Sequence, residues 1–138
     1  ESDVTFNFAA SADWFITEKL TFRCGGFNGT QFSSFYEENG LQFISGWAGF
    51  GYRWKPSLIF SVRGVYREDD YLDPVTHQGV TKDRFDKRME GHARIDYLAP
   101  GGGFLRIYLE ATYDKVDSNF DFVDYEDQRI ILGANVRY

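Results

Sequence analysis

The chain is poor in cysteine and proline, and it contains no long apolar run. Its single cysteine, Cys24, cannot form a disulfide within the chain. Because Cys24 falls among alternating apolar residues, we expect a buried and unreactive thiol. No stretch is apolar over the roughly 20 residues that a transmembrane helix requires. An excess of basic residues is also lacking, since the net charge is −6, and this argues against nucleic-acid binding.

The chain is instead rich in strict alternation of residue type. From Gly46 to Trp54, and again from Leu58 to Tyr66, every second residue is apolar or glycine. Successive side chains of a β-strand point to opposite faces of the sheet, so this period indicates strands. The turn Lys55-Pro56-Ser57 separates the two runs. The sequence therefore predicts a β-hairpin over Gly46–Tyr66.

The same hairpin pattern occurs in two other parts of the chain. One copy runs from about Arg88 to Asp114 around the turn Ala99–Gly103, and a looser copy runs from Phe6 to Gly26. A last alternating run, Ile130–Tyr138, ends the chain on an aromatic residue. We therefore predict an all-β, antiparallel, up-and-down arrangement of seven strong strands within one domain, residues 1–138.

The runs between the hairpins are polar and contain glycine or acidic residues. They predict three long connections, Gly25–Gly40, Glu68–Asp86 and Lys115–Gln128. The first of these contains Thr30–Glu37, a weakly alternating piece that fits either a short strand or part of a loop. Short turns and long polar connections would thus alternate along the chain.

Such alternation fits a soluble barrel with its apolar face inside and a membrane barrel with its apolar face outside. The predicted apolar face carries many Gly and Ala residues, which a soluble core of this size would not use to reach native packing density. Lipid fills the space around small side chains without leaving a cavity. The aromatic residues of this face lie near strand ends, where a membrane interface would hold them: Trp14, Tyr52, Trp54, Tyr66, Tyr97, Tyr113 and Tyr138.

The opposite face is strongly ionic, with both signs interleaved. A solvated soluble sheet could show the same pattern, but together with the small residues and the aromatic positions it favours a membrane barrel with a wet interior. The residues predicted to line that interior and to influence permeation are Arg63, Arg67, Arg88, Glu90, His92, Arg94, Arg106, Glu110 and Arg129.

Three segments resemble bacterial outer-membrane β-barrels: the short turn Trp54-Lys55-Pro56-Ser57, the charged stretch Tyr66–Asp70 and the last strand ending in Asn135-Val136-Arg137-Tyr138. Within that group, Tyr113–Tyr138 is similar to the ends of large porins, including barrels that export polysaccharide. The resemblance implies a location in the bacterial outer membrane, with lipid and lipopolysaccharide around the protein. It also implies that the last strand, ending on Tyr138, is recognised by the barrel-assembly machinery. Short turns would face the periplasm.

Seven strands present a difficulty for this assignment. Bacterial single-chain barrels have even strand numbers, and an open sheet edge in lipid leaves backbone groups unsatisfied. Either the chain is the C-terminal part of a larger barrel, with further strands of the same barrel or other subunits as partners, or Thr30–Glu37 is the eighth strand of a small closed barrel. The aligned turns of the hairpin repeat favour the first arrangement.

Sites for chemistry are weak in this sequence. Asp117-x-Asn119-x-Asp121 has the opening spacing of a calcium loop, but Phe122 and Gln128 stand where glycine and glutamate are needed. The two histidines are too isolated to form a metal pair, and no nucleophile elbow surrounds a serine. We therefore predict no catalytic residues, no metal site, no cofactor and no enzymatic activity.

The main hypothesis is thus an outer-membrane barrel that forms a channel or porin wall, with a charged lumen for passage or export of polar solutes. Its arginines, such as Arg63 and Arg106, would contact anionic or sugar solutes. One alternative is a small closed outer-membrane barrel that acts as a scaffold or adhesin through its loops. Another is a soluble lipocalin-like barrel that binds a ligand inside.

Overall fold

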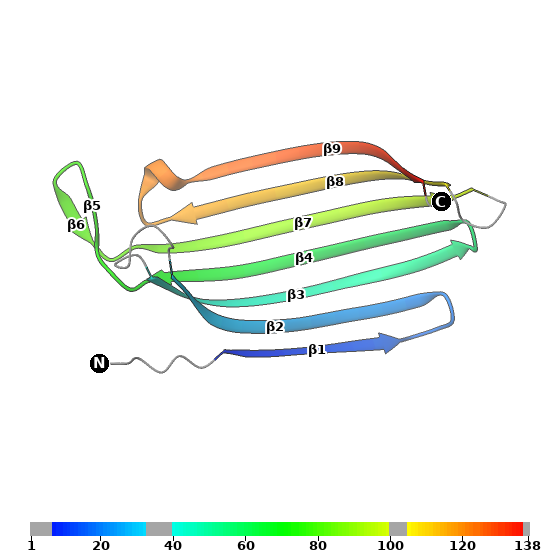
Figure 1. Cartoon of the computed structure of the whole chain (residues 1–138), viewed down its shortest axis with the longest axis horizontal. Helices are drawn as coiled ribbons and strands as arrows, with labels where there is room; N and C mark the ends of the chain where they lie inside the picture. Colours follow the sequence, from blue (N-terminus) through cyan, green and yellow to red (C-terminus); the bar gives the residue numbers. More distant parts are fainter. Residues whose placement is uncertain (1–6, 33–39, 100–104, 137–138) are drawn as a thin grey trace.

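The computed structural model of the chain describes residues 7–32, 40–99 and 105–136. These form a seven-stranded sheet in which every neighbouring pair is antiparallel and the strands lie in chain order (Figure 1). The predicted all-β, antiparallel, up-and-down fold is confirmed. Its strands are β1 (Phe8–Phe15), β2 (Leu20–Phe32), β3 (Gly40–Lys55), β4 (Leu58–Tyr71), β7 (Phe85–Leu98), β8 (Leu105–Ser118) and β9 (Tyr125–Val136).

Two small elements lie at the end of the sheet where the long connections are. A separate two-stranded hairpin, β5 (Val75–His77) with β6 (Val80–Lys82), stands between β4 and β7. A single turn of 3-10 helix, η1 (Asp121–Val123), precedes β9. Within the described residues, no helix is long and apolar enough to cross a membrane.

The strands are longer than the apolar alternation predicted. Parts of Gly25–Gly40, Glu68–Asp86 and Lys115–Gln128 were assigned to connections, and this is wrong for residues 27–32, 68–71, 85–86, 115–118 and 125–128, which are strand. In the extensions of β4, β7, β8 and β9, charged side chains form ion pairs within the sheet, such as Arg67 with Asp69 and Lys115 with Asp117. Such pairing stabilises a strand without an apolar face, so the hydrophobic period alone underestimates strand length.

The described part of Thr30–Glu37, which is Thr30–Phe32, lies inside β2 and forms no separate strand. Thr30, Gln31 and Phe32 belong to β2 and pair with Gln42, Leu41 and Gly40 of β3. Residues 33–39 and 100–104, which hold the rest of this piece and most of the predicted Ala99–Gly103 turn, lie outside the described residues.

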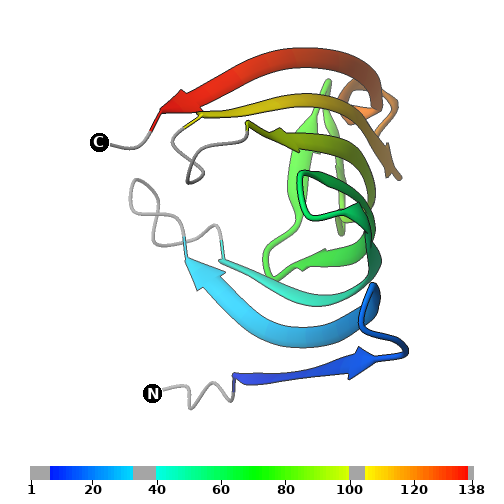
Figure 2. The ribbon, with the colours of Figure 1, turned by 90° about the vertical axis from the view of Figure 1, so that its right-hand side faces the viewer.

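The sheet is a single layer that curls into an open trough (Figure 2). It does not close, and within the described residues β1 and β9 each have only one neighbouring strand. Six antiparallel steps separate β1 from β9, so these two edge strands run in the same direction. Pairing them directly would make a parallel ladder, unlike every other pair in the sheet.

The two faces of the trough differ in burial. Most of the exposed large apolar residues of the strands lie on the convex face, where Ile130, Leu132 and Val62 are 80%, 75% and 58% exposed. The polar residues lie on the concave face, where Asp69 and Asp86 are fully buried and Asp96 is 2% exposed. In a single-layer sheet, curvature is what brings side chains together on one face. Cys24 lies on the convex face and is half-buried, not buried as predicted, because no second layer covers it.

Candidate functional site

The concave face carries the candidate functional site, because it gathers most of the buried polar groups. The strand register places every predicted lumen residue on this face, and it brings several of them into contact. His92 lies 3.7 Å from Glu90, and Arg129 pairs with Asp127. The remaining charges form two separate clusters, one near each end of the strands.

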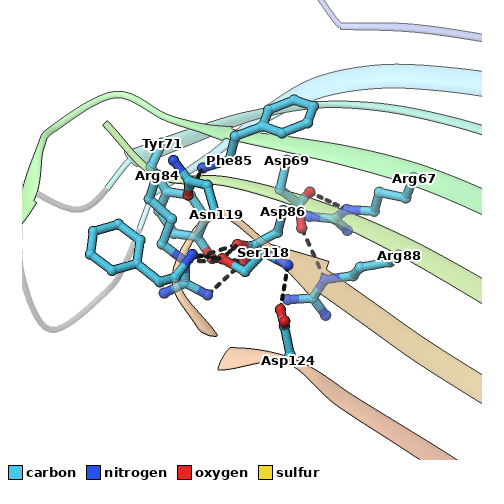
Figure 3. Close-up of polar contacts among 11 residues, drawn as sticks. Arg67, Asp69, Tyr71, Arg84, Phe85, Asp86, Arg88, Ser118, Asn119 and Asp124 are labelled. Carbon is cyan, nitrogen blue, oxygen red and sulfur yellow. Dashed lines mark hydrogen bonds and ion pairs between the residues drawn. The ribbon is translucent and has the colours of Figure 1, made fainter. Parts of the chain in front are cut away.

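The first cluster lies at the end of the sheet nearest the long connections (Figure 3). Asp69 of β4 and Asp86 of β7 are direct cross-strand partners, and both are fully buried. Arg67 pairs with Asp69 along β4, and Arg88 reaches Asp69 from β7 at 3.0 Å. Arg84 reaches Asp86 at 2.6 Å. Two carboxylates directly opposite each other repel, so the three guanidinium groups hold together a pair that is unfavourable alone.

Hydrogen bonds extend this cluster to the neighbouring elements. The Ser118 hydroxyl donates to Asp86 at 2.6 Å, and the Tyr71 hydroxyl donates to the same carboxylate at 3.3 Å. Arg84 lies just before β7. Burial alone would lower the pKa of its guanidinium, but the hydrogen bond to Asp86 and the nearby negative charges have the larger effect and raise that pKa. Arg84 therefore remains charged, and Asp86 joins β4, β7 and β8 at one point.

The second cluster lies toward the short turns and is centred on Asp96. This carboxylate accepts hydrogen bonds from Arg94 at 2.9 Å and from Arg106 at 2.8 Å. Arg94 also donates to Glu110 at 2.9 Å, so the cluster joins β7 to β8. Arg94 and Arg106 were predicted to line a lumen and contact solutes. In the structure both are already engaged by a buried carboxylate.

A second recurring feature of the concave face is a stack of glycine, aromatic ring and arginine. In each stack the aromatic residue is the cross-strand partner of the glycine, and its ring covers the position that a Cβ would take. The guanidinium of an arginine on the next strand covers the same ring, 3.9–5.0 Å from its centroid. A ring that fills the space over a glycine supports the sheet, and the cation is attracted to its π-electrons. The three stacks are Gly29–Phe43–Arg67, Gly25–Trp47–Arg63 and Gly133–Tyr108–Arg94.

A hollow of about 730 Å³ opens on the concave face toward the short turns. Residues without bulk, Gly49, Gly51 and Ser61, lie at its lining, and a Cβ added to Gly51 would meet nothing within 4 Å. Arginine and lysine side chains surround these small residues. Three carboxylates, Glu18, Asp96 and Glu110, also line the hollow, so its lining is mixed in charge with an excess of arginine and lysine.

The predicted interface aromatics lie on the opposite, convex face. Trp14, Tyr52, Trp54 and Tyr97 are exposed there toward the short turns. Toward the long connections the ring of Tyr66 is also exposed, that of Tyr113 is half-buried, and Tyr138 lies outside the described residues. The rings therefore approach both ends of the apolar surface.

Several residues of the concave face escaped the sequence reasoning. Asp69 and Asp86 were assigned to a connection, and neither Trp47 nor Tyr108 was considered as a partner for arginine. One local signal was available, because arginine precedes aspartate by two residues at Arg67/Asp69, Arg84/Asp86 and Arg94/Asp96. In a strand this spacing places both side chains on one face.

The stacks make a prediction about glycine tolerance. A methyl group at Gly133 would overlap the Tyr108 ring, whereas one at Gly51 would stand in open space. We expect Gly133→Ala to lower the free energy of unfolding by about 1–3 kcal/mol, as overpacking does. Gly51→Ala should be neutral or slightly stabilising, because it restricts the unfolded chain. Denaturant unfolding of the two variants measures the difference, and equal stabilities would contradict the stack.

The described residues define the chain as an all-β protein whose seven-stranded sheet is antiparallel and up-and-down. No protein-family model, curated protein or solved structure matches the chain. Among the residues that the structure describes, no three His, Cys, Asp or Glu side chains gather as they would around a metal ion. The proposal below therefore depends on the geometry of the two faces.

Proposed function

We propose that the chain forms part of the wall of a bacterial outer-membrane β-barrel, a porin-like channel for passage or export of polar solutes. The observation that carries this proposal is the inside-out distribution of side chains. Large apolar residues such as Leu132 and Ile130 are 75% and 80% exposed, whereas the carboxylates of Asp69 and Asp96 are buried. Contact of such an apolar surface with water costs much free energy, whereas contact with lipid does not.

The height of the apolar surface supports a membrane environment. On β8 the convex face is apolar from Leu105 to Tyr113 and becomes charged at Lys115 and Asp117. Nine residues extend about 30 Å along a strand, and a tilt of about 40° shortens this to about 23 Å along the membrane normal. That height is close to the apolar band of about 25 Å on outer-membrane barrels. Lipid and lipopolysaccharide would contact this surface.

A soluble ligand-binding barrel would distribute its residues in the opposite way. Its concave face would hold the apolar core and its convex face the charges. Here the concave face holds the ion-pair clusters of Asp69 and Asp96, and large apolar residues cover the convex face. This distribution argues against the lipocalin-like alternative.

Closure of such a barrel needs strands beyond the seven described. Because β1 and β9 run in the same direction, antiparallel closure takes an odd number of additional strands, and the total is then even. Further strands of the same barrel or other subunits would supply them. The position of Thr30–Phe32 inside β2 supports this larger barrel over the eight-stranded one. The barrel-assembly machinery would insert the protein through its last strand.

The proposal is tested by the solvent that the chain requires and by conductance. We expect the purified full chain to need detergent or lipid vesicles to keep its β-structure, and to produce stepwise conductance in planar bilayers once the barrel is closed. A chain that is folded and monomeric in plain buffer would contradict a membrane location. A chain that inserts into bilayers without conducting would contradict the channel and favour the scaffold alternative.

A further inference from the structure

We propose that Arg63, held by Trp47, is a binding site for the carboxylate group of a polar solute. The inference deepens the proposed function and rests on it, because it takes the concave face as the wall of an aqueous lumen. It comes from a comparison among the three glycine–aromatic–arginine stacks, which share one construction and differ at one position.

The shared construction fixes the guanidinium of each arginine. A Cβ at Gly25 would lie 2.8 Å from Nε1 of Trp47, so the indole lies directly against the sheet. The Arg63 guanidinium lies over the indole, 5.0 Å from its centroid. One side of the guanidinium is thus covered by the ring, as it is for Arg67 over Phe43 and Arg94 over Tyr108. A guanidinium that is covered on one side keeps the N–H donors in its own plane, and a planar carboxylate can accept two of them.

The three stacks differ in what accepts those N–H groups. Asp69 follows Arg67 by two residues and Asp96 follows Arg94 by two residues, and each carboxylate pairs with its arginine. The corresponding position after Arg63 is Val65. The chain therefore positions an arginine guanidinium over an aromatic ring three times, but it pairs that guanidinium with an aspartate of its own only twice.

No neighbouring acid replaces the missing carboxylate. Glu90 is the cross-strand partner of Val65, but its charge lies 3.7 Å from His92. Across residues 7–32, 40–99 and 105–136, Arg63 takes part in no ion pair, and the same holds for Lys19 and Arg53. All three cations line the hollow described above. An anion that enters the hollow would therefore meet cations without internal partners.

The shape of the hollow defines the kind of solute that fits. Its volume, about 730 Å³, lies in the range of sites that hold small organic molecules. Its floor has open space over Gly51, the cross-strand partner of Ser61, and the Ser61 hydroxyl offers a hydrogen bond. Since aspartate is the ligand of the other two stacks, the occupant inferred here is a carboxylate on a polar, hydroxyl-bearing solute such as a sugar acid.

Calorimetric titration of the full chain in detergent tests this site. Glucuronate and glucose make a matched pair, because they differ in a carboxylate against a hydroxymethyl group. We expect glucuronate to bind and glucose not to bind, and we expect Arg63→Gln to weaken glucuronate binding at least about tenfold. Arg63→Lys keeps the charge but loses the planar fork and should recover only part of the affinity.

Arg129→Gln is the matched charge control. It removes the same charge at the same register of the sheet, since Arg63, His92, Thr112 and Arg129 are successive cross-strand partners, and Arg129 already pairs with Asp127. We expect its glucuronate affinity to stay within about twofold. Equal losses in Arg63→Gln and Arg129→Gln would overturn the proposal, because they would indicate general charge attraction only. Inorganic phosphate that binds more tightly than glucuronate would overturn the assignment to a carboxylate.

The sharpest variant leaves Arg63 in place. Val65→Asp supplies the carboxylate that the other two stacks contain, so it should compete with the solute and abolish glucuronate binding. Val65→Asn, which has a similar size and no charge, should keep it. Loss in both variants, or in neither, would overturn the proposal. Circular dichroism of each variant in the same detergent shows whether the fold is kept, and Arg63→Lys provides the test if Arg63→Gln fails to fold.

The outcome is distinguishable from failure of the proposed function. A chain that inserts into bilayers and conducts but does not bind glucuronate through Arg63 would overturn only the carboxylate site. A chain that remains monomeric in plain buffer and still binds glucuronate through Arg63 would overturn only the membrane channel.

Discussion

Arginine at Leu132 is expected to block membrane insertion, whereas arginine at the adjacent Ile131 is expected to be tolerated. The two residues are neighbours on β9 with similar volume, but Leu132 lies on the convex face and is 75% exposed, while Ile131 lies on the concave face and is 42% exposed. A guanidinium on the lipid side near the bilayer midplane costs about 2–4 kcal/mol. On the lumen side it stays hydrated, and the change should be within about 0.5 kcal/mol.

Refolding into lipid vesicles, followed by circular dichroism and protease protection, measures the difference. Leu109→Arg should behave like Leu132→Arg, since Leu109 is the cross-strand partner of Leu132 and is also exposed on the convex face. The assignment of the two faces would be reversed if Ile131→Arg blocked insertion and Leu132→Arg did not. Equal tolerance of both would mean that neither face meets lipid.

The sequence was sufficient to predict the strands and the side of the sheet that each residue faces. Alternation is a local property, so Val62 and Arg63 are assigned to opposite faces without knowledge of any other strand. The ends of the strands were predicted less well, because β4 continues through Glu68, Asp69 and Asp70, where the alternation is carried by ion pairs. A hydrophobic period does not detect such pairs.

Contacts across strands could not be predicted, because they depend on register. Arg88 lies beside Asp69 only because β4 and β7 pair with Asp69 opposite Asp86. A shift by one residue would move each side chain to the other face. The Trp47 stack needs the registers of β2, β3 and β4 together. For this reason Arg63 was assigned to the polar face of the sheet, but its position against Trp47 was not predicted.

The concave face combines two uses of arginine. Around Asp69, Asp86 and Asp96 the guanidinium groups neutralise buried carboxylates and join neighbouring strands. At Arg63 the guanidinium is positioned in the same way but is left for another molecule. Structural arginines are expected to affect stability when changed, and Arg63 is expected to affect solute binding.

Asp69 offers the clearest test of the structural role, because its neighbour Asp70 is a matched control. Asp69 is fully buried between Arg67 and Arg88, whose side chains are 25% and 38% exposed, whereas Asp70 is exposed on the convex face. Removing one partner of a buried ion pair costs about 3–5 kcal/mol. Because both arginines keep contact with water, and because the repulsion between Asp69 and Asp86 is relieved, we expect a loss near the lower end of that range.

Asp69→Ala should therefore lower the free energy of unfolding by about 3 kcal/mol, and Asp70→Ala should change it by less than about 0.5 kcal/mol. Denaturant titration in detergent micelles measures both. The loss should shrink in a variant that also replaces Arg67 and Arg88 by glutamine, since those guanidinium groups then no longer repel each other across β4 and β7, where they are direct partners. If Asp70→Ala were as destabilising as Asp69→Ala, acidic charge in general would explain the effect. The ion-pair cluster would then have no special part in holding the long-connection end of the sheet.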